Sequence, residues 1–339
     1  MVNADAIRRA LETLQDPAES LLRFGYIIDQ KTGKKLKYDP WAITHDLQST
    51  IISYASNPPK TVHGQTKWLA LLGYRQGGKS TTGELAFYPK AAYRYGHDHV
   101  CIADTRPRAD YLHQRVHVTH RNWPEEIRSP TVSTREVRQA TFDPELMLGG
   151  KMRVLSAHTD AVGIGQSPDS FHGSEPPFWK NGAYAWSLIQ PSMINRDHAL
   201  VLLEGTAAPS DAPSVEWWKD ICRDAKHGRG RWVYAFFPYW DGKLNTRPWP
   251  KDWTLENDEI RLLERFGAQG LTLENLAFRR FILDTDKLMR RYPELFDVFY
   301  PKDDTSCWVA SAKGVIPKHI LNRHLAGPLT EWEGPYMEY

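Results

Sequence analysis

The hydrophobic and polar positions of this chain change their period several times along its length. Between residues 67 and 237, short apolar runs alternate with amphipathic stretches at helical spacing. The apolar runs predict strands over 68–72, 99–103, 151–156, 200–204 and 232–236. The amphipathic stretches predict helices over 81–92, 108–121, 184–189 and 215–226. Strands that alternate with helices are typical of a doubly wound, mainly parallel sheet, so the pattern predicts an α/β core flanked by helices.

The segments on either side of this core are predicted to be mainly helical. Before the core, helices are expected over 4–15, around residues 21–22, and in the stretch that ends at Asn57-Pro58-Pro59. After Pro238 the chain becomes rich in Trp, Pro and charge, and amphipathic helices are then expected over 256–266 and 273–284. We therefore divide the chain into an N-terminal helical lead-in over 1–60, a core over 61–240 and a small, mostly helical C-terminal lid over 241–339.

Composition narrows the class of protein without identifying it. The chain has 339 residues, of which 41% are hydrophobic and 25% charged, as in an ordinary globular protein. Its apolar runs are too short for a membrane span. The formal net charge of +2 does not by itself indicate a nucleic-acid binder. Three scattered cysteines form neither a C-x-x-C pair nor a disulfide framework, so a reducing cytoplasm is the expected compartment.

The most informative motif follows the first strand of the core. Gly73 and Gly78 are the two glycines of the phosphate-loop pattern G-x-x-x-x-G-K-[ST], which continues with Lys79 and Ser80. The loop stands between a predicted strand and a predicted helix, as that pattern requires. Backbone N–H groups of such a loop surround phosphate oxygens, and the lysine holds the β and γ phosphates while the hydroxyl ligates Mg²⁺. We therefore predict a P-loop NTPase of the RecA-like (ASCE) type that uses ATP and Mg²⁺.

An ATPase also needs a carboxylate that activates the attacking water, and the residues alone leave this assignment open. Glu175, in the segment Ser170-Phe171-His172-Gly173-Ser174-Glu175, is the first choice, and Ser174 stands where many P-loop enzymes have a metal-binding Asp. Phe171 and His172 make a poor strand, however, so an exposed loop is equally compatible. Asp104 and Asp160 are rival bases. Thr206, at the tip of the 200–204 strand, is a candidate γ-phosphate sensor.

Other clusters of acidic residues and histidines have the side chains that metal sites use. His97-Asp98-His99 has metal-ligand residue types but no partner at a suitable spacing, so a loop entering a strand is the better interpretation. Asp284 with Asp286, and Asp303 with Asp304, are the kind of pairs found in two-metal nucleases. They are predicted at a helix end and in a loop, which favours a solvated surface.

The order of motifs resembles one family, the large terminase subunit of tailed bacteriophages, which is the ATP-driven motor that packages DNA into procapsids. Six segments carry the resemblance: the phosphate loop Arg75-Gln76-Gly77-Gly78-Lys79-Ser80-Thr81, the second core strand 99–105, the acidic segment 171–179, the coupling motif 203–207, the helix and aromatic strand 217–240, and the Tyr-Pro segment 290–299. In the acidic segment, Ser-Glu replaces the more usual Asp-Glu.

The resemblance implies roles for individual residues. Glu175 becomes the base, Thr206 couples hydrolysis to movement, and Arg75 contacts the γ-phosphate or acts as a switch. Gln48, on the helix before the core, would read adenine. Ser174 would touch Mg²⁺ directly or through water, beside Ser80. A charge-stabilising arginine would come from a neighbouring subunit, for which four residues are candidates: Arg121, Arg128, Arg135 and Arg138.

The resemblance also implies partners and a place of action. Double-stranded DNA, a portal protein, a small terminase subunit and further copies of this chain in a ring are expected in the host cytoplasm, with no membrane. The chain stops about where the nuclease domain of the family begins, so an ATPase half without cutting activity is expected. Two alternatives remain: a nucleic-acid helicase, which needs a second RecA-like domain, and a non-catalytic nucleotide-binding assembly module, which the Ser at position 174 supports.

Overall fold

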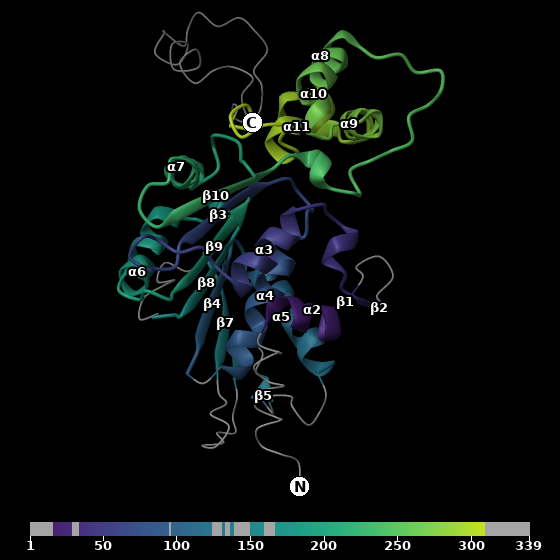
Figure 1. The fold of residues 1–339 in the computed structure, drawn as a ribbon. Helices are drawn as coiled ribbons and strands as arrows, with labels where there is room; N and C mark the ends of the chain where they lie inside the picture. Colours follow the sequence, from purple (N-terminus) through teal and green to yellow (C-terminus); the bar gives the residue numbers. More distant parts are fainter. Residues whose placement is uncertain are drawn as a thin grey trace, which may run out of the picture.

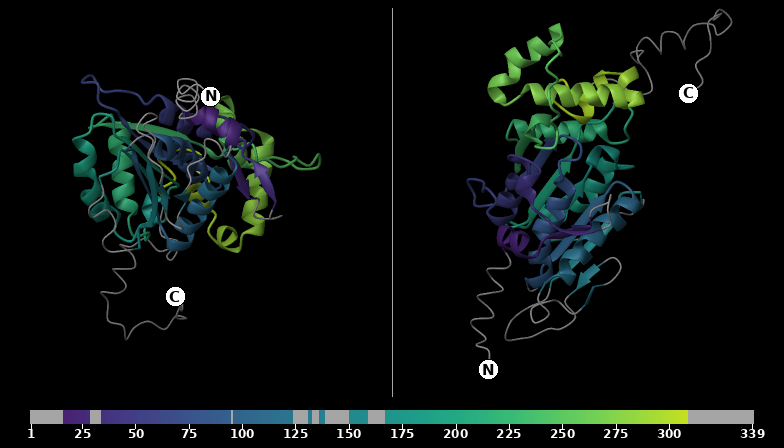
Figure 2. Two further views of the ribbon diagram at one scale, coloured as in Figure 1. Left: turned by 90° about the horizontal axis from the view of Figure 1, so that it is seen from below. Right: turned by 90° about the vertical axis from the view of Figure 1, so that its right-hand side faces the viewer.

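The computed structural model describes residues 16–28, 34–94, 96–123, 131–132, 136–138, 150–158 and 167–308. Its centre is a twisted sheet with helices on both faces, and a group of C-terminal helices lies at one end (Figures 1 and 2). The helix predicted over 4–15 falls outside these ranges. The sequence prediction of an α/β protein with flanking helices is confirmed.

The sheet contains six parallel strands and two antiparallel ones at an edge. Its order is β10-β3-β9-β8-β4-β7-β6-β5, in which β10 to β7 run parallel and β6 and β5 are antiparallel. The bounds are β3 Trp68–Gly73, β4 Asp98–Ala103, β5 Thr131–Val132, β6 Glu136–Arg138, β7 Lys151–Ser156, β8 Ser170–Ser174, β9 Leu200–Gly205 and β10 Trp232–Phe237. All five strands predicted for the core are confirmed.

Strand β8 was not among the predicted strands. It lies in the middle of the sheet between β9 and β4, and all five of its residues are buried. The polar His172 at its centre made the segment look like a poor strand. In the structure that imidazole contacts the carboxylates of Glu84 and Glu204, so its burial is compensated by groups from other elements.

Helices cover both faces of the sheet (Figure 1). One face carries α2 Pro17–Phe24, α3 Leu47–Ser56, α4 Lys79–Tyr93 and α5 Arg106–Arg121, and the other carries α6 Gly182–Ile194 and α7 Val215–Lys226. The helices predicted over 81–92, 108–121, 184–189 and 215–226 are confirmed, although α6 is much longer than expected. A small hairpin of β1 Tyr26–Ile28 and β2 Lys35–Lys37, which was not predicted, lies beside α5. Short 3-10 turns occur at η1 Pro40–Ala42, η2 Pro176–Phe178 and η3 Tyr239–Asp241.

The chain after β10 forms helices that pack at the carboxyl end of the strands (Figures 1 and 2). They are α8 Asn257–Phe266, η4 Gly267–Gln269, α9 Leu273–Thr285, α10 Lys287–Arg291 and α11 Glu294–Phe299. The helices predicted over 256–266 and 273–284 are confirmed. The main hydrophobic cluster runs without interruption from the sheet into these helices, for example through Leu276 and Phe296. No second alternation of strands and helices follows β10 in the described chain, which extends to residue 308.

Candidate functional site

The phosphate-loop segment connects β3 to α4 in a tight turn. Strand β3 ends at Gly73 and the helix begins at Lys79. Two loop residues have left-handed backbone angles, Gln76 with φ 64° and Gly78 with φ 74°. A Cβ at Gly78 would lie 2.3 Å from Gln48 Nε2, so position 78 requires glycine both for its backbone angle and for space. The strand, turn and helix thus have the arrangement of a loop that surrounds phosphate.

Gln48 forms a hydrogen bond with the backbone of this loop. Its side chain comes from α3, is 1% exposed, and donates from Nε2 to the Gly77 carbonyl at 2.9 Å. Tyr38 OH lies 2.7 Å from Thr82 Oγ1, and that hydroxyl donates to the Gly78 carbonyl at 3.0 Å. Gln48 was expected to read adenine, but it does not line the cavity described below. Its amide contacts the loop backbone at the Gly77 carbonyl, and adenine recognition by Gln48 stays a prediction.

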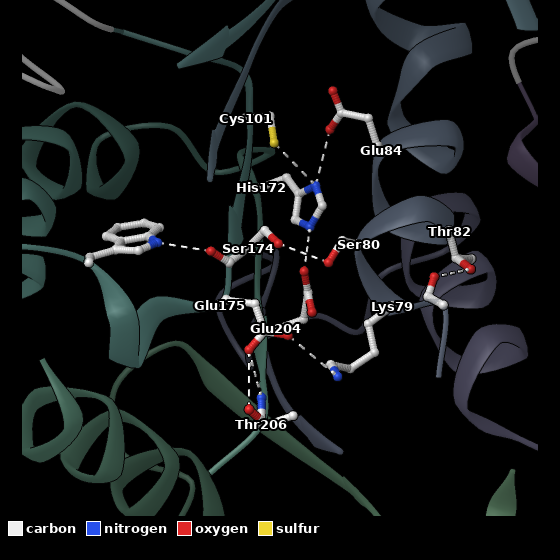
Figure 3. Close-up of polar contacts among 12 residues, drawn as sticks. Lys79, Ser80, Thr82, Glu84, Cys101, His172, Ser174, Glu175, Glu204 and Thr206 are labelled. Atoms are coloured by element: carbon white, nitrogen blue, oxygen red, sulfur yellow. Dashed lines mark hydrogen bonds and ion pairs between the residues drawn. The ribbon is translucent and has the colours of Figure 1, made fainter. Parts of the chain in front are cut away.

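Lys79 lies between the loop and the acidic segment (Figure 3). Its Nζ donates to the Tyr74 carbonyl at 2.8 Å and lies 3.9 Å from Glu175 Oε1. The lysine is largely buried, whereas the Glu175 side chain is slightly more exposed. The predicted phosphate ligand and the predicted base therefore face each other, although 96 positions separate them in sequence, counted as 175 minus 79.

Glu175 is held in an unusual conformation at the end of β8. Its φ of 51° and ψ of 56° place it in the left-handed region, which non-glycine residues seldom adopt and which is concentrated at functional sites. Its N–H donates to the Glu204 carbonyl at 2.8 Å. Its Oε2 accepts from the N–H and the hydroxyl of Thr206, at 3.2 and 3.3 Å. The structure therefore brings together Glu175 and Thr206, from adjacent strands, at the carboxyl edge of the sheet.

Two serines are the predicted metal ligands, and they lie against each other. Ser174 Oγ is 2.8 Å from Ser80 Oγ, and Ser174 is buried. The Ser174 backbone is fixed by Trp179, whose Nε1 donates to its carbonyl at 2.9 Å. Mg²⁺ prefers oxygen ligands and usually keeps several waters together with substrate phosphate oxygens. A pair of hydroxyls beside a phosphate loop fits that requirement.

A cavity of about 540 Å³ collects these groups. Its volume lies within the range of ordinary small-ligand sites. One wall is formed by α5, and the lining includes loop residues Arg75 to Thr81 together with Asp104, Arg108, Tyr111, Leu112, Arg115, Ser174, Glu175, Phe178, Thr206 and Phe299. The carboxyl ends of parallel strands, where this cavity lies, are where α/β proteins bind ligands.

Asp104, the rival base, also lines the cavity but has a different environment. Burial raises the pKa of its carboxyl, and the opposing effect of Arg108, whose Nε lies 3.6 Å from Oδ1, does not offset this. Backbone N–H groups of Thr105 and of Asp104 itself act on this carboxyl, whereas Glu175 accepts from both the N–H and the hydroxyl of Thr206. The other rival, Asp160, lies outside the described residues.

Arg75 connects the loop to the C-terminal helices. Its N–H donates to the Phe299 carbonyl at 2.8 Å, and its guanidinium lies 5.0 Å from the centre of the Phe299 ring. Both residues line the cavity. The end of α11 therefore contacts the phosphate loop directly.

The four arginines considered for a neighbouring active site are only partly covered by the structure. Arg121 is the last residue of α5 and is exposed, and Arg138 ends β6. Arg128 and Arg135 lie outside the described ranges. Arg121 does not line the cavity of its own chain.

The acidic pairs near the C-terminus have structural partners. Asp286 caps α10 by accepting from two backbone N–H groups, and Asp303 accepts from the N–H groups of Thr305 and Ser306. Asp304 forms an ion pair with Lys226. These contacts agree with the interpretation of the pairs as loop and helix-end residues.

Sequence analysis missed a second polar cluster, which lies within the protein (Figure 3). His172 Nδ1 is 3.2 Å from Glu84 Oε2 and 3.6 Å from Cys101 Sγ, while His172 Nε2 is 3.3 Å from Glu204 Oε1. All four residues are fully buried. Burial opposes charge, but the two carboxylates outweigh it and raise the pKa of His172 to about 9. The only sequence signal was the placement of Glu84 and Glu204 among apolar neighbours.

The His97-Asp98-His99 segment enters β4 as predicted, and its histidines extend this cluster. Ser170 Oγ lies 2.8 Å from both His97 Nε2 and His99 Nδ1. Burial lowers the pKa of His99 and lowers that of His97 to about 3, so both imidazoles are neutral. The polar partners of these histidines are distant in sequence: Ser170 lies on β8, and Glu84, near His99, lies on α4.

Neither a scan against protein-family models nor a search of curated proteins gives a match for this chain. A search of solved structures does give matches. The large terminase of HK97 bacteriophage aligns with a TM-score of 0.53 and 15% identity, over 84% of this chain and 55% of that one. The large terminase ATPase domain of Thermus phage P74-26 aligns with a TM-score of 0.45 and 17% identity, over 69% and 90% of the two chains. This chain shares its fold with the HK97 large terminase, as the resemblance predicted, and spans about half of that protein.

Proposed function

We propose that this chain is the ATPase of a viral DNA-packaging motor, which hydrolyses ATP to move double-stranded DNA into procapsids. The observation that carries the proposal is the approach of Lys79 to Glu175 across the cavity, with Thr206 holding the carboxylate from the opposite side. The proposed phosphate ligand Lys79, the proposed base Glu175 and the proposed γ-phosphate sensor Thr206 therefore share one site. The fold shared with the HK97 large terminase supports the choice of this motor over other P-loop ATPases.

The loop and the first turn of α4 bind the nucleotide phosphates. The backbone N–H groups over 75–81 and the helix N-terminus attract phosphate oxygens, and Lys79 neutralises charge on the β and γ phosphates. Ser80 holds Mg²⁺, with Ser174 beside it directly or through water. When bound, Mg²⁺ neutralises charge that develops on the phosphates.

Glu175 acts on the attacking water. Its carboxylate accepts a proton while the water oxygen forms a bond to the γ-phosphorus, and the bond from that phosphorus to the β–γ bridging oxygen breaks to release ADP. The two hydrogen bonds from Thr206 orient the carboxylate towards this water. An arginine of a neighbouring subunit, drawn from Arg121, Arg128, Arg135 and Arg138, stabilises charge in the transition state.

Two contacts connect the cavity to the rest of the molecule. The Thr206 carbonyl accepts from Trp218 Nε1 on α7 at 3.1 Å, so a shift of Thr206 after phosphate release reaches α7. Arg75 is held against Phe299, so a change at the γ-phosphate reaches the C-terminal helices α8 to α11. These contacts support Thr206 as the coupling residue and Arg75 as a switch.

The partners proposed for the motor follow from the resemblance. They are double-stranded DNA, a portal protein, a small terminase subunit and further copies of this chain in a ring, all in the host cytoplasm. In the described ranges, no helix is long and apolar enough to cross a membrane.

A non-catalytic nucleotide-binding module is the second candidate function. The observation that favours it is Ser174, which offers a hydroxyl at a position where a carboxylate would bind Mg²⁺ more strongly. A helicase has less support, because it requires a second RecA-like sheet that the described chain up to residue 308 does not contain.

ATP turnover and ATP binding, each measured with and without double-stranded DNA over a range of protein concentrations, separate the candidates. The motor proposal expects Mg²⁺-dependent phosphate release that DNA or higher protein concentration increases. Tight ATP binding without turnover under every condition would favour the assembly module instead. Single-stranded DNA serves as the matched control, since preferential stimulation by single strands would favour a helicase.

A further inference from the structure

Four residues with metal-ligand side chains meet beneath helix α4. His99 and Cys101 are two positions apart on β4 and therefore point to the same face of the sheet. The strand register places Cys101 opposite His172 of β8. Glu84 reaches this face from α4, which packs against it. Three separate elements thus deliver a thiol, two imidazoles and a carboxylate to one place.

The ligand atoms of Glu84, Cys101 and His172 lie close together, and the ligand atom of His99 lies near that of Glu84. Glu84 Oε2 lies 3.2 Å from His172 Nδ1 and 3.9 Å from His99 Nε2. The ligand atoms of Glu84, Cys101 and His172 all lie within 4.8 Å of one another. All four side chains are fully buried. The group is therefore a closed cluster, as structural metal sites are.

Hydrogen bonding within the protein leaves two atoms of this cluster unsatisfied. Among the described residues, His99 Nε2 and Glu84 Oε1 are buried and have no hydrogen-bond partner. A buried polar atom without a partner costs about 1–3 kcal/mol, so such atoms are rare unless a ligand satisfies them. The free nitrogen of His99 is directed at the same carboxylate that contacts His172.

The outer contacts of the two histidines also match those of metal ligands. His172 Nε2 lies 3.3 Å from Glu204 Oε1, and His99 Nδ1 lies 2.8 Å from Ser170 Oγ. These contacts fix both rings from the side away from Glu84. The other nitrogen of each ring, Nδ1 of His172 and Nε2 of His99, faces Glu84. Metal-ligating histidines are characteristically oriented in this way.

We propose that Glu84, Cys101 and His172 form a structural site for a divalent transition-metal ion, Zn²⁺ by its donor set, and that His99, whose Nε2 lies 3.9 Å from Glu84 Oε2, completes the coordination. One sulfur, two nitrogens and one oxygen suit four-coordinate zinc better than Mg²⁺ or Ca²⁺, which prefer oxygen ligands. Binding exchanges the thiol proton of Cys101 and the Nδ1 proton of the His172 imidazolium for one doubly charged ion. The net charge of the buried cluster therefore does not change.

The proposed metal site lies among the same elements that form the cavity. It joins α4, β4 and β8, which carry Lys79, Asp104 and Glu175 at their ends. A metal ion here fixes the spacing between the phosphate loop and the proposed base without contacting the nucleotide. The site stands independently of the proposed function, since none of its ligands lines the cavity.

The first test is the metal content of the full chain, expressed without a histidine tag and purified without chelators, by elemental analysis. We expect about one zinc ion per chain, as for a closed structural site. Cys101→Ser and His172→Asn should lose most of this zinc. The matched controls, Cys222→Ser and His113→Asn, alter a buried cysteine and a buried histidine outside the cluster and should keep it.

Co²⁺ is the second probe, and it keeps the proposal testable if the variants fold poorly. Chelator-treated parent protein loaded with Co²⁺ should show tetrahedral visible bands and a thiolate-to-cobalt charge-transfer band. The Cys222→Ser variant should retain that charge-transfer band. If the parent purifies without zinc and takes up neither Zn²⁺ nor Co²⁺, the cluster is a hydrogen-bonded network and the proposal is wrong. A bound metal that survives Cys101→Ser unchanged would also overturn it. Neither readout uses ATP, so the outcome does not depend on the proposed function.

Discussion

Helix α4 carries two polar sites that differ in their access to water. Its first turn places Lys79 and Ser80 at a cavity of about 540 Å³, while Glu84, one turn later, belongs to a fully buried cluster. In the cavity the polar groups contact one another at the edge of an open space, which suits a ligand that is exchanged in each cycle. In the cluster they are enclosed, which suits a ligand that stays. Because both sites share α4, a ligand bound in the buried cluster would also fix the position of Lys79 and Ser80.

The largest effect that distinguishes the two sites is expected at Lys79. Lys79→Ala removes the cation that faces both the loop and Glu175. Hydrogen bonds to charged groups contribute about 1.5–3 kcal/mol, so the Kd for ATP should rise roughly 10- to 150-fold. Calorimetric titration checks this, with the exposed Lys251→Ala as the matched control. Zinc content should remain at the parent level, and an unchanged Kd would contradict the assignment of the phosphate site.

Gly83 offers the reverse experiment, since it lies beside the buried cluster. A Cβ at this position would lie 2.8 Å from His172 Cε1 and 2.9 Å from His172 Nε2. Overpacking of this kind costs about 1–3 kcal/mol, which exceeds the gain of up to about 1 kcal/mol in helix propensity. Gly83→Ala should therefore lower the Tm and the zinc content.

Gly267→Ala is the control for that experiment, because no atom lies within 4 Å of its added Cβ and its φ of −58° suits alanine. Thermal unfolding of the two variants measures the difference. A Gly83→Ala protein with the Tm and zinc content of the parent would show that the imidazole is not tightly held.

A smaller effect is expected at Thr206, which acts on the cavity through Glu175. Thr206→Val removes the hydroxyl donor to Glu175 Oε2 and leaves the backbone donor in place. The loss of one hydrogen bond to a charged group, about 1.5 kcal/mol, should lower kcat roughly tenfold with ATP affinity unchanged. Thr206→Ser, which keeps the hydroxyl, should retain most of the activity. Equal kcat values for the valine and serine variants would remove Thr206 from the orientation of the base.

The two sites also differ in how far sequence could predict them. The predicted phosphate loop is local: its glycines, lysine and serine lie within eight positions between a strand and a helix, so the motif alone predicts it. Glu175 was predicted as a base on its residue type and the resemblance. Its approach to Lys79 depends on the sheet order, in which β9 lies between β3 and β8, and local periodicity does not determine that order.

The buried cluster shows why strand β8 and the partners of buried polar side chains could not be predicted from the sequence. Strand β8 was missed because His172 interrupts its apolar pattern, and the groups that make this burial possible come from α4, β4 and β9. The contact of Gln48 was likewise not predicted, because it depends on the packing of α3, which directs the amide to the Gly77 carbonyl. In both instances the partner of a polar side chain is distant in sequence, so only the fold identifies it.

The most direct test of the central claim is ATP turnover by Glu175→Gln beside Asp104→Asn, with nucleotide binding measured separately. Both changes neutralise a carboxylate that lines the same cavity. Our account predicts that Glu175→Gln lowers kcat by roughly 10²- to 10⁴-fold, the usual contribution of a general base, while ATP binding persists and Asp104→Asn keeps most of its turnover. If Glu175→Gln hydrolyses ATP like the parent, the cavity does not work as described and the proposed base is wrong.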